Sequence, residues 1–168
     1  MRLFFALWPD IDAATRLANV AAQINIQSPG RLVHSKNYHV TLVFIGEAAD
    51  SRLAVLRQVG GTLQALRCTI AFDSLEYWPK SEVVVATARE SPPGLLRLGT
   101  QLRAATGLPP VRLRVHVTLA RKVAQAPVLQ AMSAVFFRAA SFSLVRSETG
   151  GAESAYTVVD TWPLLDET

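Results

Sequence analysis

The sequence predicts an α+β domain in which helices lie on mixed or antiparallel sheets. The expected elements follow the order strand, helix, strand, helix, hairpin, helix and three further strands, which differs from the regular alternation of a doubly wound parallel sheet. No change in composition marks a linker, and half of the 168 residues are apolar. Residues 1–168 are therefore expected to form one domain with two closely merged lobes.

Apolar runs and capping residues define the elements of the first half. The run that begins at Leu3 predicts a buried strand, and Pro9 stops it. Asp10 is placed to cap the following helix. The expected elements are a strand at 3–8, a helix at 10–24, a short extended piece at 31–33, a strand at 38–45 and a helix at 50–66, which contains two adjacent glycines near its end.

Proline and glycine mark the boundaries of the second half. Residues 79–81, Pro-Lys-Ser, predict a hairpin turn, while the Pro92-Pro93 pair opens a helix that Gly107 closes. The expected elements are strands at 68–78 and 82–88, a helix at 93–106, and strands at 112–120, 141–147 and 155–162.

Composition limits the classes of function. Cys68 is the only cysteine, which excludes an intramolecular disulfide and a cysteine-based metal site, and favours a reducing, cytoplasmic compartment. The apolar run at the N-terminus is too short to cross a bilayer. Of the 17 basic residues only three are lysines, and arginine suits phosphate oxygens, although a compositional bias of the genome would give the same count. No glycine-rich nucleotide-binding motif is present.

The tetrapeptide His-Val-Thr-Leu occurs twice, at residues 39–42 (the first motif) and 116–119 (the second motif), in a chain with only three histidines. In a strand, alternation places the histidine and threonine of each copy on one face. Two such strands side by side would surround one cavity with two imidazoles and two hydroxyls. One imidazole can take a proton from water and the other can give one to a leaving oxygen, while the hydroxyls hold a phosphate.

Two other interpretations compete with this one. A single copy of the motif would be read as an amphipathic strand with a half-buried histidine, but the repeat favours a shared site. The alternative functional reading is a zinc site with His34 as third ligand. It is disfavoured because no carboxylate or cysteine accompanies either motif and the threonines would have no role, so neither a metal nor a cofactor is expected.

At these motifs the chain resembles the 2H phosphoesterase superfamily and, within it, the LigT-like RNA 2′,3′-cyclic phosphodiesterases. Residues 37–46 are similar to the first family motif with its strand-ending glycine, and residues 116–121 to the second motif with a following arginine. Residues 2–6 resemble the family's first strand, and residues 78–85 its aromatic-proline hairpin. The resemblance runs over nearly the whole chain.

This resemblance implies a two-lobed, pseudo-symmetric α+β fold of antiparallel sheets, with helices outside and a central cleft. It implies an enzyme that hydrolyses RNA-terminal 2′,3′-cyclic phosphate to a 2′-phosphomonoester without a metal. By position, His39 would be the proton donor and His116 the proton acceptor. Thr41, Thr118 and Arg121 would bind the substrate phosphate. The implied partners are RNA ends or nucleotides that carry a 2′,3′-cyclic phosphate, and the protein is expected to be a cytoplasmic monomer without membrane contact.

Some expectations stay open at this point. Arg121 follows His116 by an odd number of residues, so the strand must bend, bulge or end near Ala120 if Arg121 is to reach the phosphate. Tyr77 and Trp78 are both candidates for stacking on a base. The alternative functions are a 2′-5′ RNA ligase, another cyclic-nucleotide phosphoesterase, or a non-catalytic RNA-binding module of the same fold.

Overall fold

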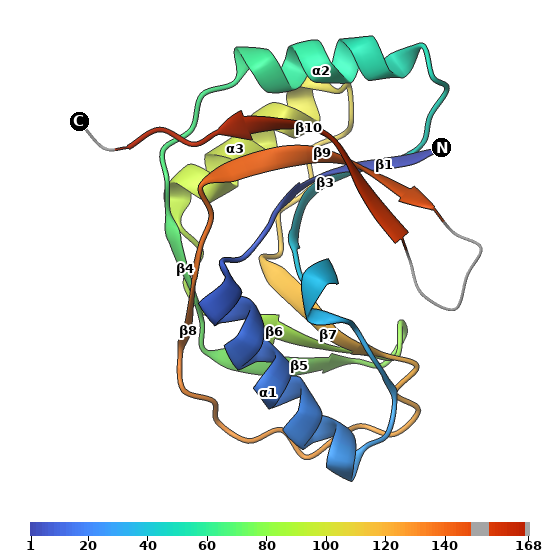
Figure 1. The fold of residues 1–168 in the computed structure, drawn as a ribbon, viewed down its shortest axis with the longest axis vertical. Coiled ribbons are helices and arrows are strands. Elements are labelled where there is room, and N and C mark those ends of the chain that lie inside the picture. The colour runs from blue at the N-terminus through green and yellow to red at the C-terminus, as the bar shows by residue number, and fades with distance from the viewer. Residues whose placement is uncertain (149–154, 167–168) are drawn as a thin grey trace.

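The structure, a computed structural model, describes residues 1–148 and 155–166 and consists of antiparallel sheets with helices packed on them (Figure 1). The elements are β1 (Arg2–Leu7), α1 (Ile11–Gln27), β2 (Arg31–Leu32), the 3-10 helix η1 (Ser35–Asn37), β3 (Val40–Glu47), α2 (Arg52–Thr62), β4 (Thr69–Phe72), β5 (Ser74–Trp78), β6 (Val83–Thr87), α3 (Pro93–Ala105), β7 (His116–Arg121), β8 (Val135–Arg138), β9 (Ser141–Glu148) and β10 (Ala155–Pro163).

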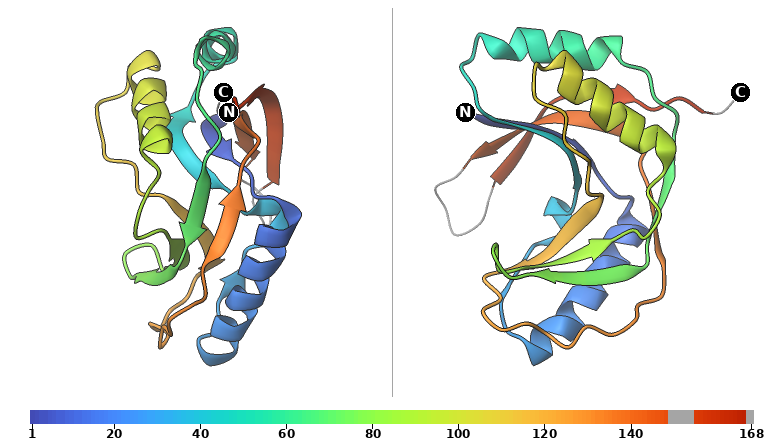
Figure 2. Two further views of the ribbon diagram at one scale, coloured as in Figure 1. Left: turned by 90° about the vertical axis from the view of Figure 1, so that its left-hand side faces the viewer. Right: turned by 180° about the vertical axis from the view of Figure 1, so that it is seen from behind.

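Two four-stranded sheets carry the two motifs. The first sheet has the strand order β10-β9-β1-β3 and the second has the order β2-β7-β6-β5, while β4 and β8 form a separate pair. α2 and α3 pack on the first sheet, and α1 lies along the second (Figure 2). The predicted fold class, with one motif strand in each antiparallel sheet and helices outside, is confirmed.

β1 lies in the centre of the first sheet, between β3 and β9. Leu3, Phe5 and Leu7 belong to the main hydrophobic cluster, to which the second sheet also contributes. Phe4 and Ala6 are buried on the opposite face. Because both faces of β1 are covered, its sequence reads as a continuous apolar run instead of an alternating one.

α1 begins as the sequence predicts. The Asp10 carboxylate accepts a hydrogen bond of 2.8 Å from the backbone N–H of Ala13, so it caps the helix. The helix continues to Gln27, beyond the predicted end, and stops where Ser28 precedes Pro29, a position at which helical backbone is disfavoured. No helix in the described part of the chain is long and apolar enough to cross a bilayer.

The two adjacent glycines lie inside α2, and one of them is required by packing. A Cβ atom on Gly60 would meet the Trp162 ring at 2.4 Å. Glycine lowers helix stability by about 1 kcal/mol relative to alanine, but here it lets the helix approach β10. The helix predicted over 50–66 is present, but it spans only Arg52–Thr62.

Three strand predictions need correction. The run at 68–78 is two strands, β4 and β5, in different sheets, because Asp73 leaves the strand between them and its carboxylate accepts the N–H of Arg89 at 3.1 Å. The strand predicted at 112–120 begins only at His116. β8 was not predicted. Its four residues alternate between buried and exposed, a pattern too short to stand out in the sequence.

Candidate active site

The two motif strands, β3 and β7, contact each other where the two sheets meet (Figure 1). His39 is the residue just before β3, and His116 is the first residue of β7. The two rings are close enough for a positive charge on His116 to lower the pKa of His39. The fold therefore brings the two motifs together, although they are far apart in the sequence.

Both motif histidines are held in the same way. Nδ1 of His39 lies 2.7 Å from the carbonyl oxygen of Asn37, and Nδ1 of His116 lies 2.7 Å from that of Arg114. In each case the carbonyl belongs to the residue two positions upstream. A carbonyl only accepts hydrogen bonds, so Nδ1 is assigned the proton in both rings. Nε2 of each ring is then available for proton transfer.

The two motif strands also share an irregularity. In the β1–β3 pair, Phe5 lies opposite Val43 and Ala6 opposite Thr41, which leaves Leu42 as an extra residue. In the β6–β7 pair, Val84 and Val85 lie opposite Ala120 and Thr118, which leaves Leu119 as the extra residue. Each motif thus ends in a bulge at its leucine.

The bulge changes which later residue faces the site. After it, the residue five positions from each histidine lies on the cleft side, namely Phe44 in the first motif and Arg121 in the second. A cavity of about 290 Å³ contains His39 and Thr41 together with both of these residues. The bulge at Leu119 therefore allows Arg121 to line the cavity despite its odd offset from His116. Thr118 lies two residues after His116 on β7.

Arginines make this cavity positive. Arg31 lies opposite Arg121 in the β2–β7 pair, and Arg2 joins them in lining the cavity. The side chain of Phe44 is exposed, with the Arg2 guanidinium 5.2 Å from its ring centre. Sequence reasoning missed Arg2, Arg31, Phe44 and Tyr156 as cavity residues, since only strand register and sheet order bring them there.

Aromatic rings enclose His39. The ring centres of Phe4, Trp8 and Tyr156 lie 5.1, 5.3 and 5.1 Å from that of His39, and the Tyr156 ring meets it edge-on at 81°. Burial among these rings lowers the pKa of His39 to about 4. The hydrogen bond to the Asn37 carbonyl opposes this shift, and the positive charges of Arg121 and His116 add to it.

His116 has more polar surroundings. The Trp78 ring lies 4.7 Å from it, measured between ring centres. Burial is the main cause that lowers the pKa of His116, and the charges of Arg114 and Arg121 act in the same direction. The Arg114 carbonyl and the Glu76 carboxylate oppose the shift. Both histidines are consequently neutral in the free protein at pH 7.

Other residues considered from the sequence lie elsewhere or have structural contacts. The hydroxyl of Tyr77 donates a 2.7 Å hydrogen bond to the Val123 carbonyl and its ring packs on the face of the sheet away from the site. His34 is exposed and its Nδ1 accepts a hydrogen bond from the backbone of Lys36. Within residues 1–148 and 155–166, no group of three or more histidine, cysteine or acidic side chains could hold a metal ion.

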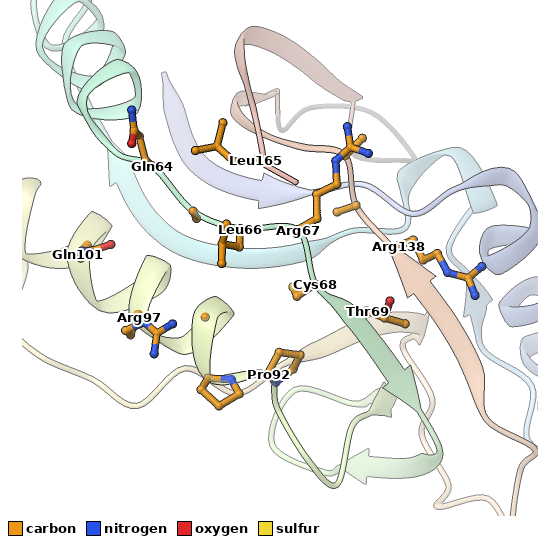
Figure 3. Close-up of a pocket in the computed structure, with 15 residues that line it drawn as sticks. Gln64, Leu66, Arg67, Cys68, Thr69, Pro92, Arg97, Gln101, Arg138 and Leu165 are labelled. Atoms are coloured by element: carbon orange, nitrogen blue, oxygen red, sulfur yellow. The ribbon is translucent and has the colours of Figure 1, made fainter. Parts of the chain in front are cut away.

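A large cavity lies away from the motifs, on the side of the molecule where α3 begins (Figure 3). It has a volume of about 1010 Å³, and neither a motif residue nor Arg121 lines it. Arg67, Arg97 and Arg138 surround it, and Arg67 is paired with Asp166 at 3.1 Å. This wide, solvent-exposed groove is thus separate from the paired histidines.

The chain is similar to known phosphoesterases. The family model described as LigT like Phosphoesterase matches residues 7–85, which include the first motif. An RNA 2′,3′-cyclic phosphodiesterase of Escherichia coli (strain K12) is 25% identical over 97% of this chain and 96% of its own length. An enzyme of the same description from Thermus thermophilus is 28% identical over 99% of this chain and 92% of its own.

Structural similarity extends over the whole fold. The crystal structure of Escherichia coli LigT complexed with 3′-AMP has a TM-score of 0.88 and 27% identity, covering 97% of each chain. The similarity thus includes the second motif, which lies outside the segment that the family model matches. Together with the paired motif strands, these similarities relate this chain to the LigT-like phosphoesterases, a family of hydrolases.

Proposed function

We propose that the protein hydrolyses a 2′,3′-cyclic phosphate at the end of an RNA or on a nucleotide and leaves a 2′-phosphomonoester. The observation that carries this proposal is the matched pair of imidazoles, each anchored through Nδ1 to the carbonyl two residues upstream. The names of the relatives from Escherichia coli and Thermus thermophilus, and the LigT complex with 3′-AMP, support the substrate class.

In the proposed reaction, Nε2 of His116 takes a proton from water, and the water oxygen attacks phosphorus. The bond from phosphorus to the 3′ oxygen breaks, and protonated His39 gives its Nε2 proton to that oxygen. The product carries a 2′-phosphate and a 3′-hydroxyl. His116 ends protonated and His39 neutral, so exchange of protons with solvent restores the starting state.

His39 must gain its proton when the substrate binds. Its pKa of about 4 keeps it neutral in the free protein at pH 7. A phosphate anion beside it offsets the positive charge of Arg121, which is one cause of that low pKa. The substrate itself would therefore favour the protonated, donating form of His39.

The remaining groups suit a phosphate. The hydroxyls of Thr41 and Thr118 would donate hydrogen bonds to the non-bridging oxygens, where negative charge increases during attack. Arg121 adds a guanidinium that lines the same cavity as Thr41 and His39. These contacts stabilise charge and leave the proton transfers to the histidines.

Phe44 is the best support for a nucleoside as the rest of the substrate. Its side chain is 48% exposed, although it lies on a strand of the first sheet with buried neighbours, and it lines the cavity of His39. An exposed aromatic ring beside a phosphate site offers a face on which a base can stack. Arg2 over that ring adds a cation at the same end of the cavity.

The test is hydrolysis of nucleoside 2′,3′-cyclic phosphates and of an RNA oligonucleotide with a cyclic end, followed by ³¹P NMR of the product. A 2′-phosphate from the natural protein, lost in His39→Ala and in His116→Ala, is the expected result. Binding of the RNA without turnover would instead favour the non-catalytic module. Joining of two RNA ends through a 2′-5′ bond in place of hydrolysis would favour the ligase.

A further inference from the structure

A polar cluster on the second sheet lies against His116, and the described residues form no counterpart around His39. Glu76 and Trp78 are two residues apart on β5, so their side chains leave the same face of the sheet. Arg114 precedes His116 by two residues, just before β7. Thr87 of β6 lies directly opposite His116 in the antiparallel pair. Three neighbouring segments of the sheet thus direct these side chains to the same place.

The Glu76 carboxylate connects the side chains of the cluster through hydrogen bonds. Its Oε2 accepts a hydrogen bond of 2.7 Å from the Trp78 indole N–H and another of 2.7 Å from the Arg114 guanidinium. The buried Thr87 hydroxyl also hydrogen-bonds to this carboxylate. These bonds hold the pKa of Glu76 below its usual value, mainly through Trp78, so the carboxylate is ionised at the pH of the reaction.

Trp78 is the member that reaches the histidine. The Arg114 guanidinium lies over its ring at 4.3 Å, and the ring in turn lies 4.7 Å from His116 at an angle of 56°. An indole fixed at its N–H by a carboxylate and covered by a cation has little freedom to turn. His116 is therefore held at Nδ1 by the Arg114 carbonyl and at its ring by Trp78.

We propose that Glu76 is a positioning residue for His116, acting through a bracket of Trp78 and Arg114 that holds the imidazole where it can take a proton from water. This inference rests on the proposed function for its catalytic part. Glu76 does not touch the substrate in this arrangement. It orients the indole, and the indole orients the histidine.

Charge gives the bracket a second effect. Among the described residues, the charged or titratable groups that act on His116 are Arg114 and Arg121 from its own segment, Glu76 from β5 and His39 from across the cleft. The carboxylate is the single negative group among them, and it raises the pKa of His116 while both arginines lower it. Loss of the carboxylate would leave His116 a weaker base.

The experiment compares Glu76→Gln and Glu76→Ala with Glu90→Gln, a matched change at an exposed glutamate in the loop after β6. Gln can still accept the hydrogen bond from the Trp78 N–H but has no charge, whereas Ala removes both the hydrogen bond and the charge. We expect kcat for a nucleoside 2′,3′-cyclic phosphate to fall about tenfold in Glu76→Gln and more in Glu76→Ala, with KM little changed. Glu90→Gln should match the natural protein.

NMR titration of the histidine rings provides a readout that does not need turnover. In both Glu76 variants the pKa of His116 should decrease, while the signals of His39 stay in place and show that the fold is intact. Unchanged His116 titration together with natural kcat in Glu76→Ala would overturn the bracket. A natural protein that hydrolyses no cyclic phosphate would contradict the proposed function instead, and the titration would still decide whether Glu76 acts on His116.

Discussion

The two motif strands are alike as far as their bulges and differ immediately after them. Both hold a histidine by the carbonyl two residues upstream, place a threonine two residues later and continue into a bulge at leucine. The next cleft-facing residue is Phe44 on one side and Arg121 on the other. The repeat thus preserves the setting of the histidine and the backbone geometry, while the next residue that lines the cavity is aromatic in one half and cationic in the other.

The surroundings of the two histidines differ in the same way. Phe4, Trp8 and Tyr156 enclose His39, whereas Glu76 and Arg114 lie near His116. When different environments give two like groups different pKa values, one group can act as an acid and the other as a base. Burial among aromatic rings lowers the pKa of His39 to about 4, whereas the Glu76 carboxylate opposes the lowering of the pKa of His116.

The largest effect is expected from removing either imidazole. His39→Ala and His116→Ala should each lower the rate of cyclic phosphate hydrolysis by about 10² to 10⁴, the usual contribution of a positioned acid or base. Steady-state kinetics on a nucleoside 2′,3′-cyclic phosphate measures this. Natural rates in both variants would show that the repeated motif is not the catalytic machinery.

A p-nitrophenyl phosphodiester distinguishes the two roles, because its leaving group needs no protonation. On this substrate His39→Ala should regain most of its activity relative to the natural protein, while His116→Ala should not. Recovery of His116→Ala alone would reverse the proposed roles of donor and acceptor.

The next largest effect concerns stability at acid pH. The folded-state pKa of His39, about 4, lies below the value of about 6.5 for an unfolded chain, so the unfolded state binds more protons between these pH values. Lowering the pH from 7 to 4 should therefore reduce the free energy of unfolding by about 3 kcal/mol through this group.

Urea unfolding of the natural protein and of His39→Gln at several pH values measures this contribution. The pH dependence that His39 causes should disappear in the variant, and His116→Gln should remove a smaller part. Equal losses in the two variants would contradict the difference between the two environments.

Smaller effects are expected from the threonines. Thr41→Val and Thr118→Val each remove a hydroxyl donor to a charged phosphate, so we expect rates lower by about 10- to 100-fold. Proton transfer remains, and the pH profile of kcat should keep its shape. If either valine variant loses more activity than the alanine variant of its own histidine, the hydroxyl has a role beyond holding the phosphate.

No effect is expected from a chelator. Two imidazoles can move both protons of the proposed reaction without a metal, so turnover should survive dialysis against EDTA. If turnover disappears in EDTA and returns with zinc or manganese, His39 and His116 would be ligands of one metal ion. Their proposed roles as proton donor and proton acceptor would then be wrong.

Local sequence signals were sufficient for much of the fold. The apolar run of β1, the Asp10 cap of α1 and the Pro-Pro start of α3 each depend on neighbours in the chain, and each agrees with the structure. The repeated tetrapeptide also marked both motif strands. The extent of the domain over residues 1–168 and the roles of the site residues remain predictions.

Features that depend on register could not be read from the sequence. The bulges at Leu42 and Leu119 arise from pairing with β1 and β6, and without them Phe44 and Arg121 would face the other side. Arg31 reaches the site only because β2 joins the edge of the second sheet. A sequence pattern describes a single strand, whereas the orientation of these residues depends on how two strands pair.

The central place of β1 has a consequence for synthesis of the chain. One edge of β1 pairs with β9, so that residue 2 meets residue 147 and residue 7 meets residue 142. A nascent chain emerges from the N-terminus, so β1 cannot pair with β9 until residues 142–147 have also been synthesised. The positions of Phe4 and Trp8, whose rings contact His39, depend on this same pairing of β1. Such distant pairing slows folding, so the surroundings of His39 would form only after β9 has been synthesised.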